Sequence, residues 1–418
     1  MDGLEDLIDL NDAVEKATIH ANGMFLWARL LVEYLESDFL SDDDISAALA
    51  NMVHLEGLDS LYAAIFSSLQ TRRTGPAREN SKRTFEWVTS SHRPLHIDEL
   101  EVAISISGFK EVSQTSRIER FEESLGPASG ALLELSQDRM VHFIHISVKE
   151  YLNSETGKSF IRTGADLELD MAACCLFYLS RCVPPGPLSG CSKIIPDKIA
   201  VQEKFPLIRY SLESWHQHSL QGIEVLAGKD KPISTLETSV EAFIKYLSAL
   251  FFNKVAVTTW IEASWLFDVP PTVAGLSQFV RCALSEFIVP ETIFNGLSHV
   301  AEHLDQLDCD LVELNQQWGQ TLRGSPNEIW EPSIPALNDF SLWMNTEDAH
   351  SRKLQRPTQS GDDTTISLRS QVSSDGKELG VLRLCIPRFV GEIRFLLTVL
   401  ADTCEQSIQN RTFEGDEE

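Results

Sequence analysis

The residues Gly157-Lys158-Ser159 match the last three positions of a phosphate-binding loop. A complete loop has the pattern G-x-x-x-x-G-K-[ST] between a strand and a helix, so that backbone N–H groups surround the phosphates and the lysine contacts them. Here Leu152 stands where the first glycine belongs, and the preceding residues are typical of a helix end. The pattern favours a polar helix terminus, with Gly157 near its C-cap, over a nucleotide site. Turnover that depends on Lys158 would instead indicate an enzyme.

Four cysteines lie close together and raise the question of a zinc site. Cys174, Cys175, Cys182 and Cys191 follow one another at spacings that match no common zinc motif. Adjacent residues on a helix point about 100° apart, which is awkward for one tetrahedral ion. The spacing therefore favours buried structural thiols over metal ligands.

The histidines give no complete metal motif either. His299 and His303 are one helical turn apart, but the residues between them are not those of H-E-x-x-H. His216 and His218 lack a clear third ligand, and no G-x-S-x-G hydrolase motif occurs. We therefore expect no metal, no cofactor and no enzymatic activity of the chain itself.

Composition narrows the classes of partner. The 418 residues are 43% hydrophobic, enough for buried cores, and carry a net charge of −27. This charge argues against a broad nucleic-acid surface and against docking on an anionic membrane, which both need clustered basic side chains. No apolar run approaches the roughly 18 residues that span a bilayer, and the first residues lack a secretory signal pattern. The sequence predicts a cytoplasmic protein that binds neither nucleic acid nor membranes.

The first expected domain is a helical segment over residues 1–72. Residues 23–37 (GMFLWARLLVEYLES) predict a helix that is buried on most sides. Acidic residues 42–44 suit the start of a second helix, and residues 58–69 place apolar side chains on one face of a third. We expect the first helix either to pack on the next domain or to leave an exposed apolar patch that recruits a partner.

Residues 73–160 have the layout of a winged helix, which is three helices followed by a hairpin. The helical patterns and the strand-like runs fall at 77–90, 97–105, 117–125, 131–136 and 140–147. A winged helix raises DNA binding as an alternative. However, the third helix carries Glu119, Glu122 and Glu123, whereas a helix that enters a DNA groove needs an excess of Lys and Arg.

Residues 161–345 are helical again and predict an irregular array with no strict repeat period. Residues 346–418 combine a polar linker with a partial β segment, in which Asp375-Gly376 predicts a hairpin. The expected fold class is therefore mainly α with a small β component: a helical segment, a winged helix, an irregular helical array and a short C-terminal β-hairpin.

Six runs of residues, in this order along 15–220, resemble the segment that follows the NTPase core in fungal NACHT-type STAND proteins. They are GMFLWARLLVEYL, LDSLYAAIFSSL, FEWVTSSHRPLHIDELEVAIS, VHFIHISVKEYLNS, AACCLFYLSRC and FPLIRYSLESWHQHS. The middle part resembles the winged helix domain named after GPI inositol-deacylase. The resemblance implies a switch in which ADP holds an NTPase core against the winged helix until exchange for ATP frees it. This sequence has no Walker motifs, so the expected partner is a NACHT NTPase core in cis or in trans, with oligomerisation open.

The same resemblance singles out His145. In related NACHT receptors the motif F-x-H-x-S-[VF]-x-[DE]-[FY] supplies a histidine that contacts the phosphate of bound ADP, and here the motif is FIHISVKEY at 143–151. An imidazole N–H can donate to a phosphate oxygen. The alternative, which we favour for a chain without a phosphate loop, is a histidine that braces a strand-to-helix corner. The family's Thr or Ser cap of the second winged-helix helix is replaced by His96, a poorer cap.

These patterns favour a non-catalytic regulatory or interaction module of a NACHT-type STAND signalling protein, which couples a nucleotide switch to downstream repeats or partners. Two alternatives stay open. A trans-acting regulator or decoy would co-purify with an intact NACHT protein. A DNA-binding winged helix would show salt-dependent binding that is lost on reversing the charges of Arg78, Lys82 and Arg83.

Overall fold

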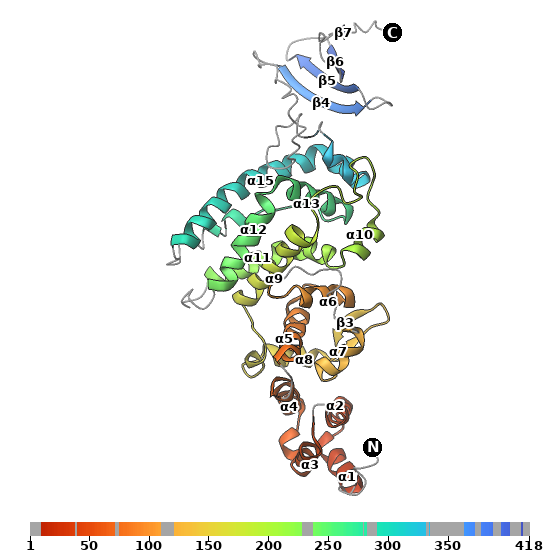
Figure 1. Cartoon of the computed structure of the whole chain (residues 1–418), viewed down its shortest axis with the longest axis vertical. Coiled ribbons are helices and arrows are strands. Elements are labelled where there is room, and N and C mark those ends of the chain that lie inside the picture. Colours follow the sequence, from red (N-terminus) through yellow and green to blue (C-terminus); the bar gives the residue numbers. More distant parts are fainter. Residues whose placement is uncertain are drawn as a thin grey trace. The chain divides into compact units, whose positions relative to one another are not determined.

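The computed structural model divides into two compact units, Met1–Glu328 and Ile329–Glu418. The larger unit is helical apart from a three-stranded sheet, and the smaller one holds a four-stranded sheet (Figure 1). The structure describes residues 10–37, 40–71, 75–109, 121–227, 237–278, 280–281, 291–331 and 334, and the strands at 363–372, 378–387, 394–401 and 411–412. The mainly helical fold class with a small β component is therefore confirmed.

The N-terminal part is built from short helices that pack around a 3-10 turn. They are α1 (Leu10–Ala21), α2 (Phe25–Leu35), α3 (Asp42–Ala50), η1 (Met52–Leu55) and α4 (Leu58–Thr71). Trp27 is fully buried, and its indole N–H donates to the carbonyl of Leu55 at 2.6 Å, which ties α2 to η1. Ser41 and Asp44 form a reciprocal capping box at the start of α3. The three predicted helices of this part are confirmed.

The next residues fold as the predicted winged helix. Its elements are α5 (Gly75–Ser90), β1 (Leu95–His96), α6 (Ile97–Ser105), α7 (Phe121–Ser129), β2 (Leu133–Leu135), β3 (Met140–Phe143) and α8 (Ile146–Asn153). The sheet is antiparallel in the order β1-β3-β2, and Val141 of the central strand is paired with a leucine on each side. Residues 110–120 lie outside the described part, and they include the first four residues of the third helix predicted at 117–125, whose remainder falls in α7.

Three details of the winged helix differ from the sequence-based expectations. The second strand of the hairpin ends at Phe143 rather than at 147, because His145 already caps α8. Strand β1 was not predicted, since two residues show no alternation. A capping box is complete at α6 despite the histidine, because His96 Nδ1 accepts from the Asp98 N–H at 3.3 Å and Glu99 accepts from the His96 N–H at 2.9 Å.

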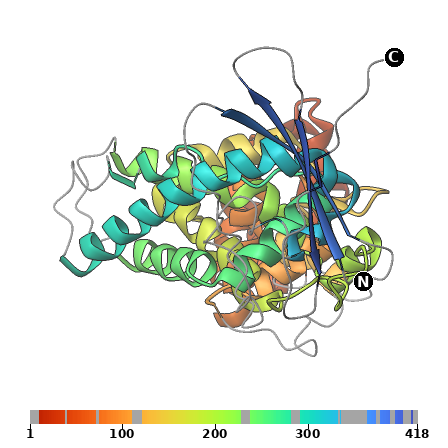
Figure 2. The same cartoon turned by 90° about the horizontal axis from the view of Figure 1, so that it is seen from above.

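The irregular helical array follows the winged helix. Its elements are α9 (Ala165–Phe177), a π-helical turn η3 (Tyr178–Cys182), α10 (Lys198–Lys204), α11 (Ile208–Ala227), α12 (Glu237–Phe251), α13 (Lys254–Leu266), α15 (Glu291–Gly324) and η5 (Pro326–Trp330). Helix α9 is buried along its length and lies against α11 and α12 (Figure 2). A Cβ on Gly222 would come within 2.7 Å of Leu169 Cγ, so this glycine permits the close approach of α11 to α9.

The smaller unit contains the predicted hairpin and two further strands. Strands β4 (Asp363–Val372) and β5 (Glu378–Pro387) pair antiparallel, as the Asp-Gly signal predicts. Strands β6 (Arg394–Ala401) and β7 (Arg411–Thr412) extend the sheet in the order β4-β5-β6-β7. Over the described residues of both units, no helix has the length and the apolar character needed to cross a membrane.

Candidate functional site

His145 stands at the corner between β3 and α8, as the strand-to-helix motif predicts. Its Nδ1 accepts the backbone N–H of Ser147 at 3.2 Å and lies 2.7 Å from the Ser147 hydroxyl. The same hydroxyl is 2.8 Å from the phenol oxygen of Tyr62 on α4. Tyr62 can therefore donate to Ser147, and Ser147 to His145. This chain of hydrogen bonds joins the winged helix to the N-terminal helices. His145 therefore braces the strand-to-helix corner, which is the alternative that we favoured.

The bracing geometry also fixes the tautomer of the ring. Because Nδ1 accepts, the neutral ring carries its proton on Nε2. His145 is exposed, so this N–H has access to an anionic oxygen of a ligand. The corner geometry thus supplies a brace and a directed donor in one residue.

The Gly157-Lys158-Ser159 stretch forms the short 3-10 turn η2 and follows α8, not a strand. A Cβ on Gly157 would lie 2.0 Å from the carbonyl oxygen of Tyr151 and 2.6 Å from the Cα of Leu152. The glycine is therefore required for the turn to fold back on α8. Lys158 pairs with the exposed Glu155 at 2.6 Å. This arrangement is a packed helix terminus, as the missing first glycine of the loop pattern indicates.

The cysteines predicted to be structural divide by burial. Cys174 and Cys175 are buried in α9, Cys182 is intermediate, and Cys191 is exposed. Burial raises the pKa of Cys175 to about 12, and that of Cys174 is raised for the same reason. The inner pair is therefore held as neutral thiols, which are poor nucleophiles and poor metal ligands.

Two of the remaining histidines bond to backbone carbonyls. His216 Nε2 lies 2.9 Å from the oxygen of Ala274, and His303 Nε2 lies 2.8 Å from the oxygen of Phe251. The side chain of His299 is outside the described atoms.

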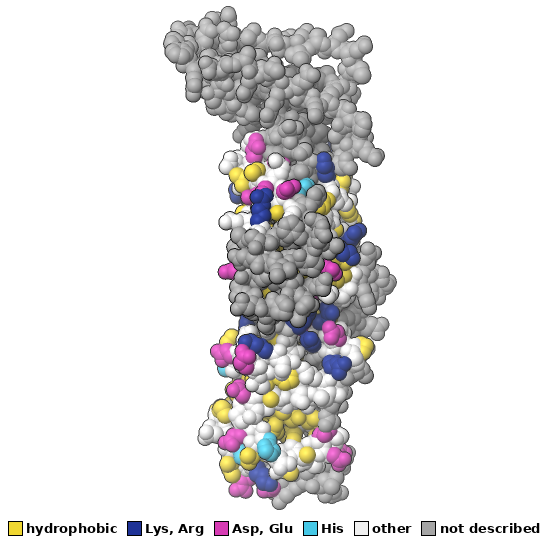
Figure 3. All heavy atoms as spheres, turned by 90° about the vertical axis from the view of Figure 1, so that its left-hand side faces the viewer, with side chains coloured by type: hydrophobic (Ala, Val, Ile, Leu, Met, Phe, Trp, Pro, Cys, Tyr) yellow, Lys and Arg dark blue, Asp and Glu magenta, His cyan; other side chains and the backbone are white. Residues whose placement is uncertain are grey.

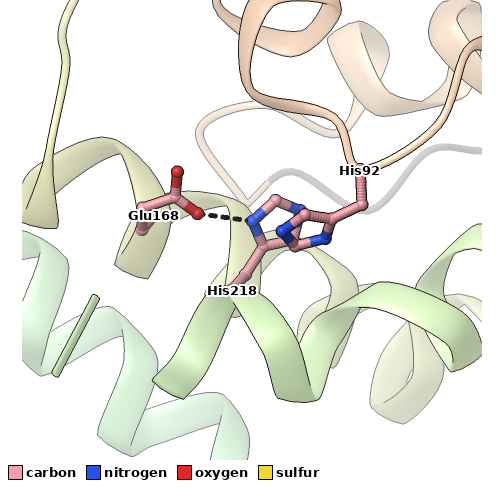
Figure 4. Close-up of side chains that lie close together, drawn as sticks. All are labelled: His92, Glu168 and His218. Atoms are coloured by element: carbon pink, nitrogen blue, oxygen red, sulfur yellow. Dashed lines mark hydrogen bonds and ion pairs between the residues drawn. The ribbon is translucent and has the colours of Figure 1, made fainter. Parts of the chain in front are cut away.

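His218 has a different environment, which the sequence did not indicate. His92 from the loop after α5, Glu168 from α9 and His218 from α11 come together where the winged helix meets the helical array (Figure 4). His218 is fully buried, with Nδ1 2.6 Å from a Glu168 oxygen and Nε2 2.8 Å from the hydroxyl of Tyr210. The ring of His92 stacks on that of His218 with centroids 4.2 Å apart. We call these three residues the His92–Glu168–His218 cluster.

Two arginines strengthen the same junction. Arg93, next to His92, binds Glu99 of α6 with both terminal nitrogens and Glu213 of α11 through Nε, at 2.7–2.8 Å. Burial alone would lower the pKa of Arg93, but the hydrogen bonds to these two carboxylates and their charges raise it above its usual value. The guanidinium is thus permanently charged and links the winged helix to the helical array.

Arg162 forms the second link. It donates to the buried Glu86 of α5 through Nε at 3.0 Å and through Nη2 at 2.9 Å, and Nη2 also contacts Asp170 of α9 at 2.9 Å. The Glu86 side chain is only 2% exposed, so its charge depends on this partner. The two arginines turn basic charge of the winged helix inward, away from any external phosphate.

The surface that reads DNA in other winged helices is not basic in the described residues. Arg139 in the wing turn is paired with Glu122 at 3.1 Å and with Asp98 at 3.5 Å. Glu122 and Glu123 lie in the first turn of α7. Because DNA binding needs uncompensated cations at these places, the geometry does not favour it.

The outer side of α2 carries two exposed apolar side chains, with Arg29, which pairs with Glu33, between them. Phe25 and Val32, seven residues apart and so on one side of the helix, are 90% and 52% exposed. We call them the α2 outer stripe. The other sides of α2 are buried or partly buried, as predicted, and these two residues match the expected alternative of exposed apolar side chains. Hydrophobic side chains also show on the surface of the N-terminal part in the lower region of Figure 3.

Comparison with protein families finds a match for the winged helix in the middle of the chain. Residues 69–164 match the family described as GPI inositol-deacylase, winged helix domain. No curated protein matches the chain, and no solved structure does. The match covers the three helices, the small sheet and α8, which are the elements that place His92, Arg93 and His145. The chain therefore contains a winged helix domain similar to that of the GPI inositol-deacylase winged helix family.

Proposed function

We propose that this chain is a non-catalytic regulatory and protein-interaction module of a fungal NACHT-type STAND signalling protein, that it acts in the cytoplasm, and that its partner is a NACHT NTPase core. The observation that carries the proposal is the α2 outer stripe. Phe25 and Val32 are exposed on a helix whose other side buries Trp27, Leu30 and Leu31. We take these two side chains as the centre of a contact surface, since contiguous exposed apolar patches mark sites where proteins bind.

The contacts of the winged helix support a coupling role. Helix α2 packs on α4, and Tyr62 of α4 bonds to Ser147 beside His145. On the other side, Arg93 and Arg162 tie the winged helix to α11 and α9. A partner that binds α2 therefore acts on an element connected through packed side chains to the helical array.

His145 has a defined part in this proposal. When an NTPase core supplies a bound nucleotide, the exposed Nε2–H donates to a phosphate oxygen, while Nδ1 stays on Ser147. Loss of that donor would weaken the preference of the assembled switch for one nucleotide state without unfolding the corner. Without a core, His145 acts as the brace alone.

The test is titration of the full chain with an isolated NACHT NTPase core from a relative that has one, followed by calorimetry. We expect saturable binding that Phe25→Asp weakens at least about tenfold, because a charge replaces a desolvated aromatic anchor. Val53→Asp is the matched control, since Val53 is 64% exposed on η1 and lies off the stripe. Equal affinities of both variants and the parent chain would refute the assignment of the stripe. Binding in trans would also support the regulator or decoy form of the proposal.

A further inference from the structure

The His92–Glu168–His218 cluster has the donor set of a transition-metal site. Two imidazoles and one carboxylate are ligands that zinc accepts in proteins, with the fourth position left to water. The three candidate donor atoms all lie within 4.8 Å of one another. Ligands of tetrahedral zinc are about 3.3 Å apart, which follows from metal–ligand distances of about 2.0–2.1 Å. Metal binding therefore requires side-chain rotations, above all to widen the 2.6 Å between His218 Nδ1 and the Glu168 oxygen.

The environment of His218 suits a metal ligand. Its Nδ1 faces Glu168 at 2.6 Å, and its Nε2 faces the Tyr210 hydroxyl at 2.8 Å. A histidine binds a metal as the neutral ring, which carries a single proton. When the metal binds Nδ1, that proton moves to Nε2, where the Tyr210 oxygen accepts the hydrogen bond. This is the second hydrogen bond that orients most metal-bound histidines.

His92 supplies the second ligand and the way in. It is exposed, whereas Glu168 is partly buried and His218 is buried, so the cluster opens to solvent on the His92 side. Its Nε2 lies 3.2 Å from the side-chain oxygen of Gln221, which accepts a hydrogen bond from the Nε2–H. The other ring nitrogen, Nδ1, then keeps its lone pair. With the proton of His218 on Nε2, each ring has one nitrogen lone pair for the ion, and the His92 ring turns out of its stack on His218 so that both lone pairs point at it. A divalent cation would compensate the negative charge of the carboxylate.

We propose that His92, Glu168 and His218 bind one divalent transition-metal cation of the zinc class, and that the ion fastens the winged helix to the helical array. The ligands come from the loop after α5, from α9 and from α11, so one ion joins three segments that are distant in sequence. On binding, metal–ligand bonds replace the hydrogen bond between His218 Nδ1 and Glu168, and the ring proton moves from Nδ1 to Nε2, so no net proton is released. Mg²⁺ and Ca²⁺ do not replace zinc, because they prefer an all-oxygen ligand set.

The experiment measures zinc binding to the full chain by calorimetry, together with the thermal midpoint of unfolding in Zn²⁺, in Mg²⁺ and without metal. We expect one bound Zn²⁺ per chain and a higher midpoint in Zn²⁺ only. His92→Ala removes an exposed ligand without opening the core and should weaken zinc binding about 100-fold. Loss of a residue that only hydrogen-bonds to a metal ligand lowers metal affinity by about 10- to 100-fold, so loss of a ligand should reach the upper end of that range. Cobalt in place of zinc should give the d–d absorption of a four- or five-coordinate nitrogen and oxygen site.

Two controls make the result specific. His54→Ala removes an exposed histidine of η1 and should leave zinc affinity unchanged. Cys191→Ser removes an exposed thiol and should also leave it unchanged. The proposal is overturned if Zn²⁺ does not raise the midpoint, if His92→Ala binds as tightly as the parent chain, or if Cys191→Ser abolishes binding.

Discussion

The replacement of Arg162 by alanine tests the junction between the winged helix and the helical array. The change removes both side-chain bonds to Glu86 and the bond to Asp170. It leaves the carboxylate of Glu86, whose side chain is 2% exposed, without its main counter-charge. Loss of one partner of a buried ion pair destabilises proteins by about 3–5 kcal/mol.

We expect a loss of about 3 kcal/mol, the lower end of that range. The backbone N–H of residue 162 still donates to Glu86 at 2.9 Å, and Lys82 Nζ remains 3.9 Å from the same carboxylate. Arg209→Ala is the control, because Arg209 is 54% exposed and pairs with Glu213 one turn along α11. Such an exposed pair contributes about 0.3–0.5 kcal/mol.

The assay is urea unfolding of the full chain, followed by fluorescence and circular dichroism. The double variant Arg162→Ala with Glu86→Gln should recover at least half of the loss, because it removes the buried charge that has no partner. The reasoning is refuted if Arg162→Ala unfolds at the same urea concentration as Arg209→Ala. It is also refuted if the double variant is less stable than Arg162→Ala alone.

Three further predictions concern other parts of the same unit. Gly157→Ala should lower the free energy of unfolding by more than about 3 kcal/mol, because the new methyl group meets backbone atoms. Lys158→Ala should change it by less than about 0.5 kcal/mol. Equal effects of the two variants in urea unfolding would contradict the packed-turn interpretation. Cys175, with its raised pKa, should resist iodoacetamide in the native chain while Cys191 reacts, as peptide mass spectrometry can show; labelling of both at similar rates would contradict the burial. Arg139→Ala should leave retention of the chain on immobilised duplex DNA unchanged at low salt, because Arg139 is already held in ion pairs, and a marked drop in retention would revive DNA binding.

Local sequence patterns predicted the winged helix because its helices and its hairpin have local signals. Helix α6 buries Ile97, Leu100 and Ile104 at the helical spacing that its sequence shows. The order of helices followed by a hairpin then identifies the architecture. Strand β1 escaped prediction because its pairing with Val141 is a tertiary contact with no local pattern.

The functional residues show where such reasoning stops. The motif around His145 marked a strand-to-helix corner, and the structure has that corner. By contrast, His92, Glu168 and His218 are separated by 76 and 50 residues along the chain, so no local spacing brings them together. One signal was present: His218 lies three residues after the buried Trp215, on the inward side of α11, where a polar ring needs a partner.

The central claim, that the chain is an interaction module for an NTPase core, is tested most directly by size-exclusion chromatography with light scattering. The full chain is mixed with an isolated ADP-bound NACHT NTPase core, and duplex DNA serves as the competing ligand. The account predicts a discrete complex of chain and core that Phe25→Asp disrupts and Val53→Asp does not. Separate elution of chain and core, together with salt-sensitive co-elution of the chain with DNA, would contradict it.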